Sequence, residues 1–230
     1  MDGSEELRNG TLRWPLAKPE SLLRHASSLV PTPRGEVIRE PDDPDARLMT
    51  RVGRGDLAAF RALVDRYQNR LVNVLYQVVG DQSEAEDLAQ NVFLKVYKAA
   101  GRYRPEAKFS TWLYRIATNT ALNALKARRR RPMVSLDEME EQGRPMNAPA
   151  GTPERPDRVL QRLEVVRAVQ QALRQLPERQ RMAVILHRFE GLSYQEIGEA
   201  LSVSVDAVDA MLRRAKASLR DALGLHRPGP

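Results

Sequence analysis

Two amides and two cations recur at helical spacing near the middle of the chain. Arg115, Asn119, Asn123 and Lys126 lie at i, i+4, i+8 and i+11, so one helix face would carry all four. Residues 102–131 around them hold nine Lys or Arg and a single acid, while the whole chain has a formal charge of +7. Because cations bind phosphates and amides hydrogen-bond base edges, this concentration of charge predicts nucleic-acid binding.

Four aromatic residues, Tyr103, Phe109, Trp112 and Tyr114, are interleaved with these cations. Taken singly, each aromatic is more typical of a helical core than of a binding surface. In combination with cations and asparagines, aromatic rings favour a single-stranded nucleic acid, on whose unstacked bases they can rest.

A second segment, Gly191 to Leu223, has the pattern of two short helices joined by a tight turn. Ser193 and Glu196 form a capping box at the first start, and Ser204 is placed to cap the second helix. This arrangement is typical of a helix-turn-helix whose second helix enters a major groove, although an ordinary helical hairpin with a charged face fits it too. The predicted buried stripe of the second helix is Val208, Leu212, Ala215 and Leu219; its outward residues include Asp206, Asp209, Ala210, Arg213, Arg214 and Lys216.

Composition excludes several other classes of site. The chain has no cysteine and only three histidines, His25, His187 and His226, which lie far apart, so neither a disulfide framework nor a metal site is predicted. No glycine-rich phosphate loop or nucleophile motif is present, so we expect no catalytic residue, no cofactor and no enzymatic activity. No apolar run is long enough to span a membrane and the acidic N-terminus does not resemble a signal peptide, so we expect a cytoplasmic protein.

Helical periodicity without any strand pattern predicts an all-α protein of two small domains joined by a flexible linker. Proline-rich residues 1–44 are expected to be a disordered tail, and residues 132–156 an acidic, proline-rich linker. The domains are then residues 45–131 and 157–224, the second ending in the helix-turn-helix, with residues 225–230 as a frayed end. Expected core residues of the helix before the helix-turn-helix are Met182, Ile185, Leu186 and Phe189.

Three ordered motifs carry a family resemblance: SEAEDLAQNVFLKVYKAA, then FSTWLYRIATNTALNALKARRR, then LPERQRMAVILHRFEGLSYQEIGEALSVSVDAVDAMLRRAKASL. With the acidic linker between the last two, they resemble the extracytoplasmic-function (ECF, group 4) sigma factors of the sigma-70 family, over about Asp45 to Leu223. The resemblance implies a non-catalytic initiation factor that binds core RNA polymerase and directs it to promoters. Residues 45–131 would be region 2 and residues 157–224 region 4.

The resemblance also assigns a docking surface and a −10 reader. Glu86, Asp87, Gln90 and Asn91 resemble the helix face that docks on the polymerase clamp, with Asn91 where the family usually has Glu. The reader of the melted, single-stranded −10 element, into which a base is flipped, would comprise Tyr103, Trp112, Arg115, Asn119, Asn123 and Lys126.

The helix-turn-helix resembles the family's reader of the duplex −35 element. Ser193, Tyr194 and Gln195 at a helix N-terminus would hold phosphates. The residues expected to face the groove are Ala210, Arg213, Arg214 and Lys216. Asp209 and Met211 depart from the Lys and Arg of many members, and Asp209 is spaced to pair with Arg213 one turn on.

Two alternatives remain open from the sequence. The first is a two-domain helix-turn-helix regulator that acts on duplex DNA without core polymerase, and the second is a helical scaffold with an incidental basic face. The family is usually held inactive by an anti-sigma factor, so the resemblance implies such a partner, and it implies no small-molecule substrate. The acidic linker, with Asp137, Glu138, Glu140 and Glu141, resembles the segment that threads the polymerase channel, but a solubilising tether has the same composition.

Overall fold

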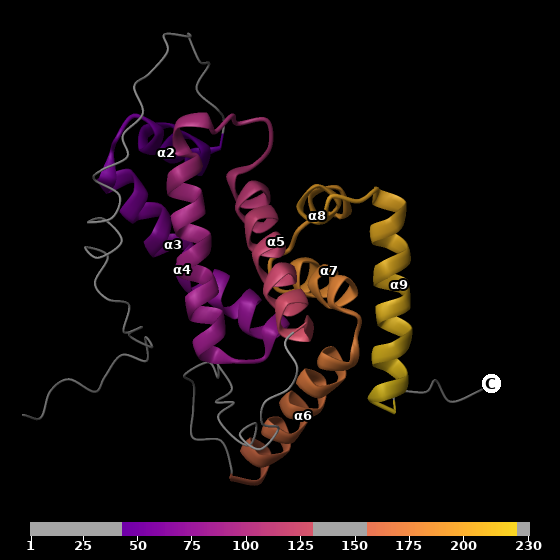
Figure 1. Cartoon of the computed structure of the whole chain (residues 1–230). Helices are drawn as coiled ribbons and strands as arrows, with labels where there is room; N and C mark the ends of the chain where they lie inside the picture. Colours follow the sequence, from indigo (N-terminus) through magenta and orange to yellow (C-terminus); the bar gives the residue numbers. More distant parts are fainter. Residues whose placement is uncertain (1–42, 131–155, 225–230) are drawn as a thin grey trace, which may run out of the picture.

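The computed structural model describes residues 43–130 and 156–224, and within residues 156–163 only the backbone. All the regular elements in these ranges are helices and none is a strand, as the sequence predicts (Figure 1). The predicted N-terminal tail, linker and C-terminal end lie almost entirely outside the described residues. The helices are α2 (Pro44–Gly53), α3 (Leu57–Val79), α4 (Gln82–Ala99), the 3-10 turn η1 (Ala100–Arg102), α5 (Phe109–Arg130), α6 (Pro156–Gln175), α7 (Glu178–Arg188), α8 (Tyr194–Leu201) and α9 (Val205–Ala222).

The N-terminal module consists of α2, α4 and α5 packed around α3. Local signals set the ends of α3: the Asp56 carboxylate accepts from the Ala59 N–H, and Gly80 closes the helix with φ at 85°. That left-handed conformation favours glycine, which has no Cβ to collide with the carbonyl. Asp81 then caps α4 by accepting from the Glu84 N–H, so one sharp turn aligns α3 and α4 as neighbours.

Asp43 joins the starts of two helices that are distant in the sequence. One of its carboxylate oxygens accepts from the Asp45 N–H at the start of α2, and the other accepts from the Phe109 N–H at 2.7 Å. Helix α5 therefore starts at Phe109, and its first amide is capped from another element.

The C-terminal module contains α6 to α9, with α8 and α9 forming the predicted helix-turn-helix. The capping box of Ser193 and Glu196 and the Ser204 cap of α9 are both present. The turn between α8 and α9 is tight, because the Val203 N–H bonds back to the Gly198 carbonyl at 2.9 Å. A Cβ on Gly198 would lie 2.9 Å from the Val203 oxygen, so the turn requires glycine there.

The two modules pack directly against each other rather than standing apart. Helix α5 packs on α8, and α3 packs on α7 (Figure 1). Their buried side chains form one continuous apolar cluster, to which Tyr114 of α5, Met182 of α7 and Ile197 of α8 all belong. This shared core was not predicted, since the sequence suggested two domains connected only by a linker.

Phe189 is a correction to the predicted core of α7. Met182, Ile185 and Leu186 are fully buried as expected, but Phe189 is 57% exposed. It lies at the C-cap of α7, where the chain leaves the helix, so the apolar periodicity no longer sets its direction. Its neighbour Glu190 occupies the inward position instead, with a side chain only 4% exposed.

Candidate nucleic-acid and polymerase interfaces

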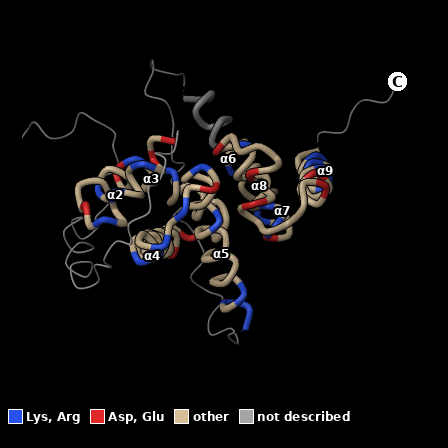
Figure 2. Tube along the Cα trace, turned by 90° about the horizontal axis from the view of Figure 1, so that it is seen from above, with Lys and Arg blue, Asp and Glu red and all other residues tan. Residues whose placement is uncertain are grey.

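The predicted polar stripe of α5 lies on the surface. Arg115, Asn119, Asn123 and Lys126 are all exposed, whereas Leu113 and Ala121 on the opposite side of the helix are buried. The helical period therefore separates a packing face from a face of two amides and two cations. Further cations gather at the C-terminal end of α5 (Figure 2), so this helix offers both base-edge and phosphate partners.

Tyr103 is not available for base stacking in this arrangement. Its ring is 7% exposed and packs against Trp112 and Phe109, with ring centroids 4.9 and 6.3 Å away. Burial, with the nearby charges of Asp43 and Asp45, raises the pKa of Tyr103 to about 12. The predicted contact of Tyr103 with the −10 strand would therefore require the loop before α5 to move.

The other three aromatics of that segment divide between core and surface. Phe109 and Tyr114 are buried, in agreement with the packing role expected of each aromatic alone. Trp112 is partly exposed at the edge of the cluster, beside the loop that leads into α5. Of the interleaved aromatics, Trp112 is the one that the fold leaves partly open to a nucleic acid.

The predicted docking surface forms one polar face of α4. Asp87 and Asn91 are exposed and Glu86 and Gln90 are partly exposed, while Leu88 and the other apolar residues of the helix face the core. The Gln82 amide donates to the Glu86 carboxylate at 2.7 Å. The face therefore presents two carboxylates next to amides, a suitable partner for a basic surface.

The outer face of α9 carries the predicted −35 reader. Arg213, Arg214 and Lys216 are exposed, and Ala210 is partly exposed between them. Arg213 pairs with Asp209 at 2.9 Å, one turn earlier, as the spacing predicts. The pair holds the Arg213 guanidinium along the helix, so this cation already has a partner within α9.

Met211 belongs to the core rather than to the groove-facing surface. It is 9% exposed and joins the shared apolar cluster. Of the two departures from the family pattern, Asp209 is therefore the one that lies on the outer side of α9, where it is partly exposed.

The start of α8 is partly occupied by its own capping groups. The Ser193 N–H and hydroxyl both donate to the Glu196 carboxylate at 2.8 Å, so neither is free for a phosphate. Tyr194 and Gln195 are exposed and remain the available residues of this predicted phosphate site. Burial raises the pKa of Glu196, but hydrogen bonds from Lys108 and Ser193 outweigh it and hold the pKa below its ordinary value.

Comparison with known proteins assigns both modules. The sigma-70 region 2 family model matches residues 63–131 and the sigma-70 region 4 model matches residues 166–219. The Pseudomonas aeruginosa RNA polymerase sigma-H factor is 40% identical over 183 residues, which cover 79% of this chain and 94% of the relative. The Escherichia coli ECF RNA polymerase sigma-E factor is 35% identical over 176 residues, 76% of this chain and 92% of the relative. This chain belongs to the sigma-70 family, as an extracytoplasmic-function sigma factor.

Solved structures support the fold of this sigma factor. CnrH in complex with the cytosolic domain of CnrY aligns with a TM-score of 0.60 at 24% identity, covering 80% of this chain and all of CnrH. RpoE of Bartonella quintana, in complex with the anti-sigma factor NepR, aligns with a TM-score of 0.57 at 19% identity, covering 73% of this chain and 98% of RpoE.

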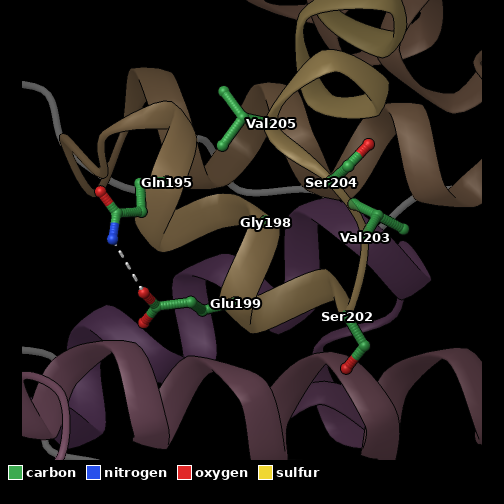
Figure 3. A pocket seen from close by; sticks show the side chains of 7 residues that line it. All are labelled: Gln195, Gly198, Glu199, Ser202, Val203, Ser204 and Val205. Atoms are coloured by element: carbon green, nitrogen blue, oxygen red, sulfur yellow. Dashed lines mark hydrogen bonds between the residues drawn. The ribbon is translucent and has the colours of Figure 1, made fainter.

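The helix-turn-helix of the sigma factor also carries an open hollow of about 440 Å³ (Figure 3). It is lined by Gln195 and Glu199 of α8 and by the turn that leads into Val205. Gln195 donates weakly to Glu199 at 3.4 Å across its mouth. The hollow adjoins the tight turn at Gly198 and lies between α8 and the start of α9.

Sequence reasoning missed the polar residues that join the two modules of the sigma factor. They are Arg70, Lys108, Arg129, Arg174, Glu178, Arg181 and Glu190. One local signal pointed to them: the last turn of α3 has no cation of its own, although helix C-termini favour one. Nothing local indicates that Glu190 turns inward, because its partners lie in distant elements.

Residues 43–130 and 156–224 form neither a cluster of metal-ligating side chains nor a membrane-spanning helix. No group of three or more metal-ligating side chains comes together there. None of the helices formed by those residues is long and apolar enough to cross a bilayer.

Proposed function

We propose that this sigma factor docks on core RNA polymerase through α4 and reads promoters with α5 and α9. The supporting observation is that the two modules each expose a cationic face, on α5 and on α9, while α4 exposes carboxylates. Opposite charges on different helices suit a protein that binds both a basic protein surface and nucleic acid.

At the −10 element, α5 acts on separated strands. Extracting a base from the duplex costs a few kcal/mol of stacking and pairing, which new contacts must offset. Asn119 and Asn123 hydrogen-bond base edges, because each amide offers both a donor and an acceptor. Arg115 and Lys126 hold the backbone from the same face, and Trp112 supports the edge of the opened duplex.

At the −35 element, α9 enters the major groove of intact duplex. Arg213 and Arg214 reach base edges, with Lys216 and the exposed start of α8 on phosphates. Asp209 limits how far Arg213 can turn toward a guanine, so this factor's −35 preference is set by Asp209 and Arg213 together.

The protein supplies binding and strand separation, and the polymerase supplies the chemistry, so we assign no catalytic residue. Its action lies in the cytoplasm, where the polymerase and the promoters are. We also propose an anti-sigma partner, because the solved relatives CnrH and RpoE are each bound by another protein, CnrY and the anti-sigma factor NepR.

Transcription with purified core polymerase tests the proposal. Genomic DNA fragments are transcribed with and without this protein, and new start sites are mapped. We expect starts that neither component gives alone, with −10 and −35 elements upstream. A protein that shifts duplex DNA alone and leaves polymerase starts unchanged would instead be a helix-turn-helix regulator, and one that binds neither would be a scaffold.

A further inference from the structure

Helix α2 and its cap contact both ends of the loop that leads into α5. This loop, residues 103–108, runs from η1 to the start of α5. At the C-terminal end of α2, a Cβ on Gly53 would lie 2.7 Å from the Ala100 carbonyl oxygen of η1, so the two backbones approach closely. At the other end, the Asp43 carboxylate accepts from the Phe109 N–H, the first amide of α5, at 2.7 Å. One helix therefore holds the loop at its beginning and at its end.

Helix α2 is in turn fixed on α3 by a buried carboxylate. Asp45 is 8% exposed, accepts from the Tyr67 hydroxyl at 2.6 Å and pairs with Arg66. The Tyr67 ring also packs edge-on against Phe109, with ring centroids 5.4 Å apart. The second Asp43 oxygen accepts from the Asp45 N–H at 2.9 Å, so the cap is continuous with this buried anchor. Because a carboxylate removed from water needs such partners, α2 has a defined position from which to hold the loop.

The held loop determines the surroundings of Trp112. Its ring packs against Tyr103 and Phe109, with centroids 4.9 and 5.9 Å away. The Tyr103 hydroxyl is buried and has no hydrogen-bond partner among the described residues, so it adds no bond that could hold the loop by itself. Trp112 is partly exposed and precedes Asn119 by seven residues, two helical turns, so both lie on the same face of α5.

We propose that Asp43 and Gly53 are positioning residues for the −10 reader. By holding residues 103–108 at both ends, they fix the place of Trp112 on the reading face of α5. Tyr103 then acts as the buried support of Trp112, and the loop stays on α2 while the strands separate. This inference rests on the function proposed above. Since only molecules with the loop in this conformation can read the element, releasing the loop lowers the apparent affinity for the opened strand.

Asp43→Asn tests the proposal with a small change. Asparagine has one acceptor oxygen where aspartate has two, so it can hold only one of the two amides. Asp81→Ala is the matched control, because it also removes one capping bond, to the Glu84 N–H at 2.7 Å. Asp81 lies at the opposite end of the 18-residue α4 from η1, about 27 Å away at about 1.5 Å per residue.

The main readout is strand opening by full-length protein with core polymerase. Asp43→Asn should lower the open-complex yield about threefold to tenfold relative to Asp81→Ala, the usual effect of one lost cap, without changing polymerase affinity. Selection from randomised −10 elements should show a weaker base preference for Asp43→Asn. Yield and preference equal to those of Asp81→Ala would mean that Asp43 only caps helices. A higher yield would mean that the loop has to leave α2, and would overturn the proposal.

Gly53→Ala tests the other end of the loop without changing a cap. The added methyl would displace η1, so we expect opening to fall as it does in Asp43→Asn. This variant also decides the question if Asp43→Asn does not fold, which urea unfolding of each protein reveals. Opening equal to that of Asp81→Ala would then refute the hold of α2 on the loop.

Fluorescence of Trp112 measures the positioning without polymerase. The other tryptophan, Trp14, is replaced by Phe in the full chain, and acrylamide quenching then reports how open the Trp112 ring is. Asp43→Asn and Gly53→Ala should raise quenching above that of Asp81→Ala, and no rise in either would overturn the proposal.

The outcomes also separate this proposal from the proposed function. If the unsubstituted protein opens no promoter with core polymerase, the proposed function fails and the −10 role of Asp43 and Gly53 fails with it. If it opens promoters and both variants behave as Asp81→Ala does, the positioning role alone fails.

Discussion

Asn119 and Asn123 are exposed amides on α5, a helix whose other side packs into the core. Both lie opposite the buried Leu113 and Ala121, so replacing either would remove the base-edge contacts proposed for it without disturbing the core. Tyr103 is the reverse case, because its ring supports Trp112 and Phe109. Substitution of Tyr103 would therefore mix loss of packing with any loss of DNA contact, and the amides are the better probes.

Asn119→Ala should impair strand opening and spare polymerase binding. The loss of two hydrogen bonds to a flipped base corresponds to about 1–3 kcal/mol, a tenfold to hundredfold fall in open-complex yield. Permanganate reactivity of −10 thymines measures opening, and a titration with core polymerase measures binding. Asn69→Ala, at an exposed position of α3, is the matched control; an opening yield equal to that of Asn69→Ala would remove Asn119 from the reader.

Asp209→Asn should change −35 recognition by releasing Arg213 from its 2.9 Å pair. Removing an acid beside the groove also lowers repulsion from phosphates, so affinity rises for all sequences as well as shifting at one position. Selection of randomised −35 elements with the holoenzyme separates the two effects. Asp221→Asn, near the other end of α9, controls for charge alone, and the same selected sequence from both variants would mean that Asp209 does not influence readout.

At the scale of elements, the helix-turn-helix depends on backbone geometry at two positions, Gly198 and Ser202. A Cβ on Gly198 would lie 2.9 Å from the Val203 oxygen, a backbone atom that the turn holds in place. Ser202 ends α8 with φ at 55°, a left-handed conformation that costs a residue with a side chain about 1–2 kcal/mol. Position 198 therefore has no room for a side chain, whereas position 202 would be more stable with glycine.

Gly198→Ala and Ser202→Gly should move stability in opposite directions. Crowding costs about 1–3 kcal/mol against about 1 kcal/mol of better helix propensity, so Gly198→Ala is destabilising overall. Ser202→Gly relieves strain and should stabilise by about 0.5–1 kcal/mol. Urea unfolding followed by circular dichroism measures both, and a stabilising Gly198→Ala would show that the turn relaxes away from the added methyl.

Helix caps formed by neighbouring residues could be predicted from the sequence, whereas a cap from a distant element could not. Capping of α8 and α9 by Ser193 and Ser204 could be predicted, because each cap acts within three residues. The start of α5 could not, since its cap comes from Asp43, 66 residues earlier. Periodicity likewise identified most buried positions but placed Phe189 inside, because it contains no information about where a helix exit points.

For the whole molecule, the sequence predicted two helical modules and their order but not their contact. Apolar positions such as Val72 and Val79 of α3 are buried, and hydrophobicity alone does not say which partner covers them. The family resemblance supplied roles for separate modules, each on its own DNA element. The polar residues of the contact, above all Glu190 and Arg181, become meaningful only when distant elements are brought together.

A core shared by both modules should make the described part of the chain unfold as one unit. Ile185 of α7 is fully buried in the cluster that also contains residues of α5, and Ile185→Ala in such a site costs about 2–5 kcal/mol. Trp112 of α5 reports the N-terminal module once Trp14, which lies outside the described residues, is replaced by Phe. If unfolding is cooperative, Ile185→Ala lowers the urea midpoint of Trp112 fluorescence as much as that of circular dichroism. Val165→Ala, at a position 63% exposed on α6, should leave both midpoints in place; a Trp112 midpoint unmoved by Ile185→Ala would mean that the modules unfold separately and that their contact adds little to stability.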